Sequence, residues 1–403
     1  MTTTNPVPTD AAAAASDVVI IGAARTPFGK MLGALSTVPA TDLAGVAIRK
    51  ALGDVDPDAI DAVILGQVLQ AGVGQNPAKQ AALAAGIPRR AHTTTVNKVC
   101  LSGLAAIIDA ARLIRSGEAH VVVAGGMENM SMAPHILPGA RSGFRYGIAE
   151  AHDHMHYDGL MDAEAGVAMG KLSEEHAERY PVNRVDQDEF AARSHQRAHA
   201  AQENGDFAAE MAPVTVQHRK GETVVNQDEG VCSDSTAEKL AELPAAFDDD
   251  GGITAGNAAQ ISDGAAAVVL ATREWAEQHN FPVLATLRAV GQVSGPDSSL
   301  QAQPANAIRQ ALDRQGWSVD NLDLIEINEA FANVAVYSAR ELGVDPAALN
   351  QCGGACSIGH PIGASGARLV VHLAHQLHSQ GLHRGAVGLC GGGGQGEALL
   401  LEA

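Results

Sequence analysis

The chain repeats one order of segments, in which short apolar runs alternate with longer stretches of helical periodicity. Residues 17–22 and 59–66 are apolar runs containing β-branched residues, and such runs predict buried strands. Strands that alternate with helices predict βαβ units and a mostly parallel sheet. The other predictions for this part of the chain are helices over 41–52, 75–85 and 101–116 and strands over 92–96 and 120–125.

A second copy of this order lies near the C-terminus, which indicates a duplicated α/β unit. If the two halves pack face to face with pseudo-twofold symmetry, their equivalent loops meet at one place. Residues far apart in the sequence can then share a site. The matching segments are 321–328 with 59–66, the helix expected over 362–377 with that over 101–116, and 386–391 with 121–126.

The chain divides into a tail, two halves and an insertion. Residues 1–16 are rich in Thr, Pro and Ala, have no basic start or long apolar stretch, and are predicted to be a disordered tail. The first half is expected over 17–126 and 256–283, and the second over 284–403. Between them, residues 127–255 are richer in His, Met and charge, lack the regular alternation, and predict an inserted loop domain.

The charge and the cysteines restrict the partners and the compartment. A formal net charge of −19 disfavours nucleic acid and anionic membranes as partners, because both are bound by clustered Lys and Arg. No run approaches the roughly 18 apolar residues of a membrane span. Five cysteines without a regular spacing favour free thiols in a reducing compartment, so we expect a cytoplasmic protein.

Three motifs place reactive side chains at the ends of predicted elements. Cys100, within residues 97–103, precedes a predicted helix, whose free N–H groups and dipole favour a thiolate. His360 lies in a tight Gly-His-Pro-Ile-Gly loop that also precedes a helix. Cys390 ends an apolar strand and is followed by four glycines, over which a ligand can approach the backbone closely. No Lys-Ser/Thr follows these glycines, so a P-loop is excluded.

Five segments, taken together, resemble the thiolase family over nearly the whole chain, and most of all its bacterial acetyl-CoA acetyltransferases. The resemblance implies an α/β fold, namely the duplicated five-layered αβαβα fold with an inserted loop domain, and a homotetramer built as a dimer of dimers. The segments are residues 97–103, 125–131, 328–332, 359–366 and 388–396.

The resemblance also implies a role for each residue of the motifs. Cys100 would be the nucleophile, and His360 would activate it and hydrogen-bond a thioester oxygen. Cys390 would remove or return the α-proton of acetyl-CoA. Asn328 would hold a water that joins His360 in one oxyanion hole, and the backbone N–H groups of Cys100 and Gly392 would form the other.

The implied reaction is a ping-pong condensation of two acetyl-CoA molecules to acetoacetyl-CoA and CoA, and the reverse thiolysis. Its partners are these coenzyme A compounds, with no metal and no separate cofactor. Four residues match pantetheine contacts of the family, although each can equally be a core residue: Met169, Phe247, Ala255 and Phe331.

Departures from the family pattern keep other functions open. Ala168 stands where many short-chain thiolases have His, and residues 257–260 contain Ala where many have Ser. A degradative 3-ketoacyl-CoA thiolase with a wider acyl channel therefore remains an alternative. A ketoacyl synthase is less favoured, because it has a second histidine in place of Cys390. A non-catalytic acyl-CoA or lipid-binding protein is less favoured because all the catalytic positions are present.

Other cysteines and histidines do not predict a metal site. Cys352 and Cys356 lack a second cysteine pair and are expected to pack as small apolar residues. Two groups of histidines are expected to lie on solvated loops or faces: His152, His154 and His156, and His372, His375 and His378.

Overall fold

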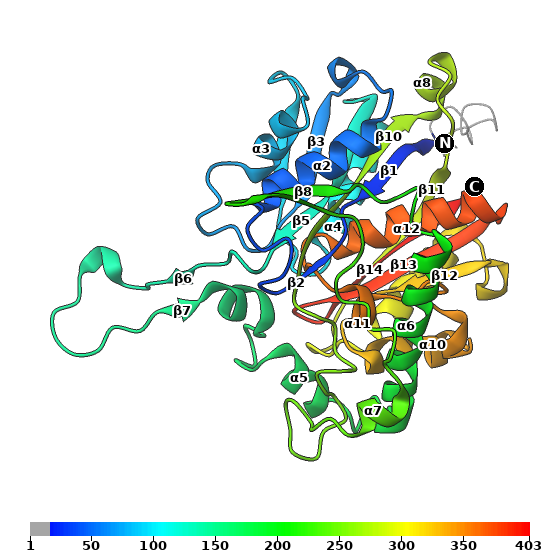
Figure 1. The fold of residues 1–403 in the computed structure, drawn as a ribbon. Coiled ribbons are helices and arrows are strands. Elements are labelled where there is room, and N and C mark those ends of the chain that lie inside the picture. The colour runs from blue at the N-terminus through cyan, green and yellow to red at the C-terminus, as the bar shows by residue number, and fades with distance from the viewer. Residues whose placement is uncertain (1–16) are drawn as a thin grey trace, which may run out of the picture.

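The structure, a computed structural model, describes residues 17–403, so the predicted tail lies outside the described residues. The strands and helices predicted for the first half are confirmed within a few residues (Figure 1). The first half contains β1 (Val18–Arg25), α2 (Ala40–Leu52), β3 (Ala62–Gly66), α3 (Pro77–Ala84), β4 (His92–Val96), α4 (Ser102–Arg115), β5 (Val121–Asn129), β10 (Ser262–Thr272) and α8 (Arg273–Gln278). The second contains β11 (Ala285–Ser294), α9 (Gln303–Gln315), β12 (Leu324–Ile327), α10 (Ala332–Leu342), α11 (Ala355–Ile358), α12 (Ser365–Gln380), β13 (Arg384–Gly391) and β14 (Gln395–Glu402).

The strands form one ten-stranded sheet in the order β12-β13-β14-β11-β1-β10-β5-β3-β4, with β2 (Gly29–Lys30) beside β10. The expectation of a mostly parallel sheet is wrong. The parallel pairs are β3 with β4, β3 with β5, and β12 with β13, whereas the other pairs of this sheet are antiparallel. The reason is that β14 follows β13 through a tight turn, which makes the two strands antiparallel neighbours. In the first half, β10 takes the matching place between β1 and β5.

Helices and strands stack in five layers, as the resemblance implied. Helices α4 and α12 lie between the two halves of the sheet, α2 and α3 cover the outer face of the first half, and α9 and α10 cover that of the second (Figure 1). A helix covered on both sides is apolar nearly all round, and α4 has buried residues on most of its circumference.

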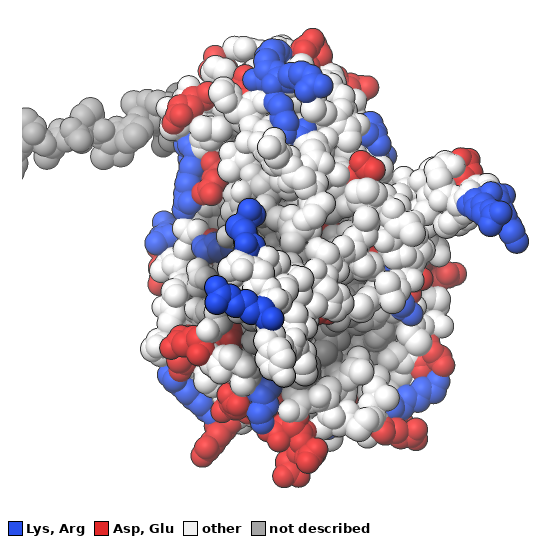
Figure 2. Space-filling view, turned by 90° about the vertical axis from the view of Figure 1, so that its left-hand side faces the viewer, with Lys and Arg blue, Asp and Glu red and all other residues white. Residues whose placement is uncertain are grey.

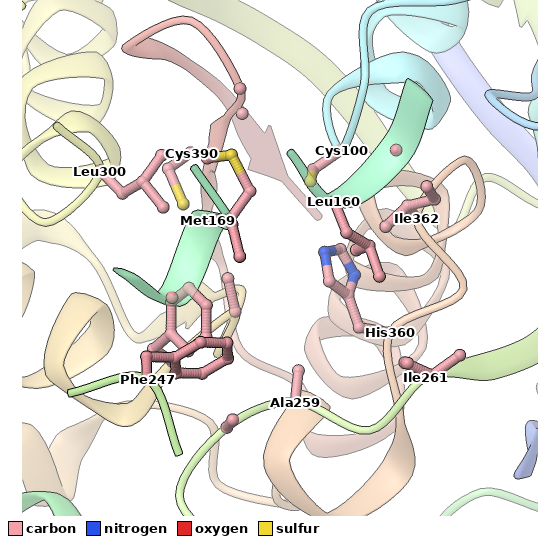
Figure 3. Close-up of a pocket in the computed structure, with 18 of the residues that line it drawn as sticks. Cys100, Leu160, Met169, Phe247, Ala259, Ile261, Leu300, His360, Ile362 and Cys390 are labelled. Atoms are coloured by element: carbon pink, nitrogen blue, oxygen red, sulfur yellow. The ribbon is translucent and has the colours of Figure 1, made fainter. Parts of the chain in front are cut away.

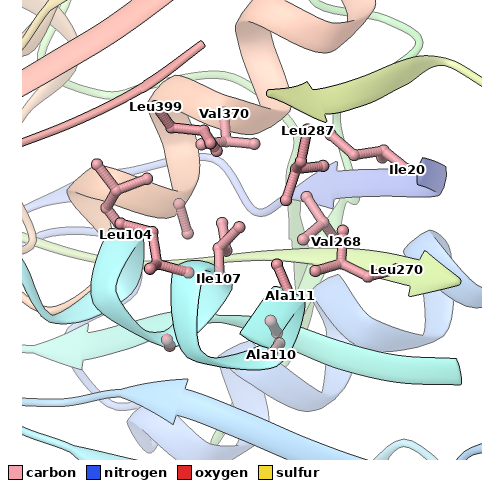
Figure 4. Close-up of a cluster of buried hydrophobic side chains, with 14 of the residues drawn as sticks. Ile20, Leu104, Ile107, Ala110, Ala111, Val268, Leu270, Leu287, Val370 and Leu399 are labelled. Atoms are coloured by element: carbon pink, nitrogen blue, oxygen red, sulfur yellow. The ribbon is translucent and has the colours of Figure 1, made fainter. Parts of the chain in front are cut away.

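The central helices pack closely because their contact faces consist of small and aliphatic residues. Leu104 and Ile107 of α4 and Val370 of α12 meet in one cluster with strand residues on both sides (Figure 4). A Cβ at Gly103 would lie only 2.9 Å from the carbonyl oxygen of Gly363, so a larger residue would separate the two helix starts. The loops before α4 and α12 are therefore held side by side.

The segment between the halves is not only loop. The polar helix α6 (Arg184–Asn204) lies against α10 and α11 of the second half. Among the helices of residues 17–403, none is long and apolar enough to cross a membrane. The further elements of this segment are β6 (His135–Ile136), β7 (His152–Asp153), the π-helix Met155–Leu160, α5 (Met169–Glu175), α6 (Arg184–Asn204), β8 (Val214–His218), β9 (Gly221–Val225) and α7 (Ala237–Ala241).

One of the histidines expected to face solvent is instead buried. The side chain of His372, on α12, is 2% exposed, and its Nδ1 lies 2.9 Å from a carboxylate oxygen of Glu210. The other oxygen of Glu210 accepts from Nε of Arg25 at 2.5 Å. Arg25 also forms a bidentate ion pair with Asp228. Burial by itself lowers the pKa of His372, but Glu210 outweighs it and raises the pKa to about 10. The network joins β1 to α12 and to the inserted segment.

This network predicts a loss of stability at alkaline pH. Because the folded pKa of His372 lies above its unfolded value, its contribution is complete below about pH 6.5 and is lost as the pH rises towards 10. The His372→Gln variant should lose about 3–5 kcal/mol of unfolding free energy near pH 6 and clearly less near pH 9.5. Urea unfolding at both pH values measures this, with His378→Gln on the exposed side of α12 as the control. An equal loss at both pH values would contradict the charge pair.

Candidate active site

The residues assigned to catalysis come from loops at the ends of the central elements. Cys100 lies just before α4 and His360 just before α12. Cys390 is the second-to-last residue of strand β13. Together with Gly392 they line one cavity of about 350 Å³. Figure 3 shows Cys100 and His360 on one side of this cavity and Cys390 on the other. The structure thus brings together residues that are up to 290 positions apart in the sequence, from 100 to 390.

A tight turn fixes Cys100. Val99 has a left-handed backbone (φ 51°), and the hydroxyl of Ser102 accepts from the Lys98 N–H at 2.8 Å and donates to the Val99 carbonyl at 2.6 Å. Burial raises the pKa of Cys100 to about 12, although backbone N–H groups of Cys100 and Gly392 oppose this shift. The thiol is therefore protonated at neutral pH. Burial therefore opposes the thiolate that the N-terminus of α4, which begins at Ser102, favours.

The imidazole of His360 is arranged as a base. Its Nδ1 lies 2.5 Å from Oγ of Ser365, whose hydroxyl donates to the Pro361 carbonyl at 3.0 Å. A hydroxyl has one proton, so Ser365 accepts from Nδ1–H, and the lone pair of the ring is left on Nε2. Nε2 is buried without a hydrogen-bond partner. Burial lowers the pKa of His360 to about 4, with a further contribution from Arg368, so the ring is neutral at neutral pH.

Ser365 was part of a recognised motif, but sequence reasoning gave it no role. The same is true of Glu128, which is fully buried beneath the loop that carries His360. Its carboxylate accepts three backbone N–H groups, from Val68 at 3.0 Å, Leu69 at 3.1 Å and Gly363 at 2.9 Å. Burial raises the pKa of Glu128 to about 7, and these three donors oppose the rise. Glu128 therefore ties β5 and the loop after β3 to the His360 loop.

Loss of one acceptor oxygen at Glu128 should disturb the site without removing a reacting group. In Glu128→Gln, an NH₂ group must face one of the three N–H donors, so the Gly363 loop shifts or one donor loses its partner. We expect kcat of thiolysis to fall about ten- to hundredfold, with a smaller change in KM. Steady-state kinetics measure this beside the exposed control Glu118→Gln. An unchanged kcat would show that the loop keeps its place without the carboxylate.

Cys390 is more deeply buried than Cys100, with 1% of its surface exposed. Burial, and secondly the neighbouring Cys100, raise the pKa of Cys390 well above its usual range. The chain then turns back into β14 through Gly393 and Gly394, both with left-handed backbones (φ 75° and 64°). Burial thus favours the protonated form of both thiols and the neutral form of His360, which can accept a proton.

Asn328 follows β12 and does not line the cavity itself. It is fully buried, and neither its Nδ2 nor its Oδ1 has a hydrogen-bond partner. Leaving two buried polar atoms unpartnered is costly, so the amide is held ready for a water or a ligand. The next residue, Glu329, holds this segment by accepting from Ser194, Asn350 and the Cys356 N–H at 2.7–2.9 Å.

Three of the four pantetheine candidates line the cavity, namely Met169, Phe247 and Phe331. The rings of Phe247 and Phe331 meet edge to face with their centroids 6.1 Å apart. Ala255 is exposed and lies outside the cavity wall. Sequence reasoning gave no substrate-contacting role to several apolar residues of the wall, although Ile362 lies in the recognised segment 359–366: Leu160, Ile261, Leu300 and Ile362.

The other cysteines and histidines take varied places. Cys352 and Cys356 are buried, as expected of small apolar residues, and Cys356 donates weakly to the Asn257 carbonyl at 3.5 Å. His154, expected on a solvated loop, is buried and lies 2.5 Å from Asp158, whereas His156 lines the catalytic cavity.

Comparison with known proteins identifies the family. The chain is 52% identical over 387 residues to a probable acetyl-CoA acetyltransferase of Mycolicibacterium smegmatis, covering 95% of this chain and 100% of that protein. It is 48% identical over 388 residues to an acetyl-CoA acetyltransferase of Pseudomonas aeruginosa, covering 96% and 99%. The crystal structure of the Bacillus anthracis acetyl-CoA acetyltransferase superposes with a TM-score of 0.93 at 41% identity, covering 96% and 98%.

Two family models account for almost all of the described chain. Residues 18–274 match the thiolase N-terminal domain, and residues 281–403 match the thiolase C-terminal domain. The matched regions contain both cysteines, the histidine and the asparagine assigned above. The duplicated five-layered fold agrees with this match. The chain belongs to the thiolase family.

Proposed function

We propose that the protein is an acetyl-CoA acetyltransferase, which cleaves acetoacetyl-CoA with CoA into two acetyl-CoA and catalyses the reverse condensation. The observation that carries the proposal is the placement of Cys100, His360 and Cys390 around one apolar cavity. The names of the relatives described above support the substrate. The chemistry uses only side chains and backbone groups of the chain, so we propose no separate cofactor and no metal.

The protonation states of the site suit the cleavage direction. His360 Nε2 takes the proton of Cys100 as its sulfur attacks the 3-carbonyl of acetoacetyl-CoA, and the backbone N–H groups of Cys100 and Gly392 receive the oxyanion. The carbon–carbon bond then breaks and leaves acetyl-Cys100. The departing enolate of acetyl-CoA takes the proton of Cys390, which becomes a thiolate.

The second half returns the enzyme to its starting state. CoA gives its thiol proton to the Cys390 thiolate and attacks acetyl-Cys100, and the protonated His360 returns its proton to the Cys100 sulfur as that bond breaks. His360 and a water held by Asn328 stabilise the enolate oxygen of the other thioester. The two halves sum to acetoacetyl-CoA plus CoA giving two acetyl-CoA, and condensation follows the same path backwards.

The apolar wall of the cavity protects the enolate intermediate from water. Leu160, Met169, Leu300, Phe331 and Ile362 surround the space between the two thiols, and they exclude water that would protonate the enolate. Cys390 is also packed against Leu300 and Val334 in a small buried cluster. The proposed general acid therefore works in a dry environment.

Ala168 favours a second candidate, a 3-ketoacyl-CoA thiolase with a broader chain length. It lines the cavity at the position where many short-chain thiolases have a larger histidine. The experiment is CoA-dependent thiolysis of acetoacetyl-CoA and of 3-ketoacyl-CoA substrates of increasing chain length. A strong preference for acetoacetyl-CoA supports the acetyltransferase, and equal or faster rates on long chains support the alternative.

We propose that the protein assembles as a homotetramer, a dimer of dimers. The β6–β7 hairpin extends away from the body of the protein (Figure 1). Tyr146 and Ile148 in its loop are 103% and 95% exposed, which is costly for apolar residues of an isolated chain. Strand β4 also ends the sheet and leaves one edge for pairing with a second copy.

The assembly proposal predicts a specific dissociation. Light scattering during size-exclusion chromatography should give the mass of a tetramer for the wild type and of a dimer for the Tyr146→Ser, Ile148→Ser double variant. Val185→Ser is the control, because Val185 is 63% exposed on α6, outside the hairpin. A monomeric wild type, or a double variant that stays tetrameric, would contradict the role of the hairpin.

We further propose a cytoplasmic enzyme without a nucleic acid partner. All five cysteines are free thiols, which fits a reducing compartment. Figure 2 shows Lys and Arg on one face in separate groups, with Asp and Glu gathered at its lower edge. On this face the distribution gives no continuous basic surface for a phosphate backbone, which agrees with the net charge of −19.

A further inference from the structure

A second pocket, separate from the catalytic cavity, is surrounded by arginines. It has a volume of about 390 Å³ and lies where α4, β11 and α9 meet. Its wall includes Arg112 and Arg115 of α4, Arg288 of β11 and Arg314 of α9, together with one carboxylate, that of Asp17. Cys100 precedes the first turn of α4, whereas Arg112 and Arg115 lie in its last turn. The pocket and the catalytic cavity therefore lie at opposite ends of one central helix.

Two of the four arginines have no carboxylate partner within residues 17–403. Arg115 donates to the Leu287 carbonyl at 3.0 Å, and Arg314 donates to the Val290 carbonyl at 2.6 Å. A guanidinium has five N–H donors, so each keeps most of its donors for another acceptor. In contrast, Arg288 is paired with Asp17 at 2.9 Å and with Glu402 at 2.7 Å.

The cluster is unusual for a chain with a net charge of −19. Burial lowers the pKa of Arg115, Asp17 opposes this change, and Arg288 and Arg112 add to the lowering. Since a guanidinium remains protonated in proteins, the proximity of these like charges is a cost that an anion would relieve.

The backbone around the pocket is rigid. Leu287 and Val290 belong to β11, which pairs with β14, and their backbone carbonyls accept from Arg115 and Arg314. The side chain of Gln315 accepts from the Ala289 N–H at 3.0 Å and fixes the end of α9 against the same strand. Figure 4 shows Leu287 of this strand in the same buried cluster as Ala110 and Ala111 of α4. The arginines are thus held on a preformed surface.

We propose that this pocket binds a small anion with two adjacent phosphate groups, such as inorganic diphosphate or the diphosphate of a nucleotide-type metabolite. Arg115 and Arg314 would each present a planar pair of donors to one phosphate. Arg112 is paired with Asp109 at 2.7 Å, so the two unpaired arginines carry the proposal. The volume is larger than one phosphate requires and leaves room for the second. The inference is independent of the proposed reaction, because the pocket shares no residue with the catalytic cavity.

Calorimetric titration of the full-length protein with inorganic diphosphate tests the proposal. We expect saturable binding that weakens as salt is added. The Arg115→Gln, Arg314→Gln double variant should bind at least about tenfold more weakly. Arg115→Lys, Arg314→Lys should fall between it and the wild type, because the charge remains but the paired donors are lost. The matched control is Arg89→Gln, Arg90→Gln, which removes two exposed arginines elsewhere and should bind like the wild type.

Further measurements separate this site from the catalytic one. Thiolysis activity and melting temperature report whether each variant is folded. Desulfo-CoA, which carries the diphosphate of CoA but no thiol, shows whether a nucleotide-type ligand also reaches the pocket: its binding should then have a component lost in the double Gln variant. Absence of diphosphate binding to the wild type would overturn the proposal. So would binding that competes with CoA in the assay and is unchanged in the folded double Gln variant.

Discussion

Replacing Cys100 by alanine is expected to lower CoA-dependent thiolysis of acetoacetyl-CoA by about four orders of magnitude or more. Cys100 supplies the sulfur to which the acetyl group is transferred, and no other group in the cavity is placed to replace it. His360 Nε2 would have no thiol to deprotonate, and Cys390 lies across the cavity (Figure 3). Initial rates at saturating substrate measure the loss.

The control for this prediction is Cys232→Ala. Cys232 is exposed and lies outside the cavity, so its loss should leave the rate nearly unchanged. Melting temperatures should be close to that of the wild type for both variants. A Cys100→Ala protein that is folded and retains more than about one per cent of the rate would exclude covalent catalysis through Cys100.

Replacing Cys390 by alanine should also abolish turnover, but by a different route. Cys390 provides the proton for the departing enolate, and loss of a general acid typically costs about 10²–10⁴ in rate. Because its thiol does not form the covalent bond, the variant should still accept an acetyl group on Cys100 from acetyl-CoA. It should therefore still exchange labelled CoA with acetyl-CoA, at a reduced rate because the CoA thiol has lost Cys390 as its proton partner, while failing to exchange the α-protons of acetyl-CoA with deuterium.

This combination distinguishes the two cysteines more sharply than loss of activity alone. Proton magnetic resonance follows the deuterium exchange, and labelled CoA follows acyl transfer in the same samples. Cys356→Ala, which removes a buried thiol outside the cavity, serves as the control. A Cys390→Ala protein that exchanges α-protons at the wild-type rate would show that another group, with His360 the nearest candidate, is the acid and base.

The repeat could be predicted from the sequence because its strands are short and apolar and its helices have clear periodicity. The loops with Cys100 and His360 could also be placed, since both precede helices of the repeat. The direction of the strands in the sheet, in contrast, could not be predicted from the sequence. Strand β10 lies between β1 and β5 because the chain comes back to the first half of the sheet after the long inserted segment. No local sequence pattern predicts that pairing.

Helix α6 shows why the inserted segment was harder to interpret. Its buried face includes Gln187, Asp188, Ser194 and His195 beside alanines, so hydrophobic periodicity gives almost no signal. Asp188 is paired with Arg184 at 2.6 Å and accepts from Asn257 at 2.8 Å. The helix is stabilised by polar contacts to residues distant in sequence, and such contacts appear only when the fold is known.

The same limit applies to the supporting residues of the site. Ser365 and Glu128 lie in recognised motifs, but their roles depend on contacts that need the folded backbone: the Nδ1 atom of His360 in the same loop for Ser365, and three backbone N–H groups from two other loops for Glu128. His372 was expected to face solvent because its carboxylate partner Glu210, which Arg25 shares, is far away in the sequence. Motifs predicted which groups react, whereas the structure shows which neighbours hold those groups in place.

The most direct test of the account is mass spectrometry of the protein after brief incubation with acetyl-CoA, followed by proteolysis. We predict one added acetyl group on the peptide that contains Cys100, removed again when free CoA is supplied, and none on the peptide that contains Cys390. An acetyl group on Cys390, or no acetylated peptide in a preparation that cleaves acetoacetyl-CoA, would contradict the proposed mechanism.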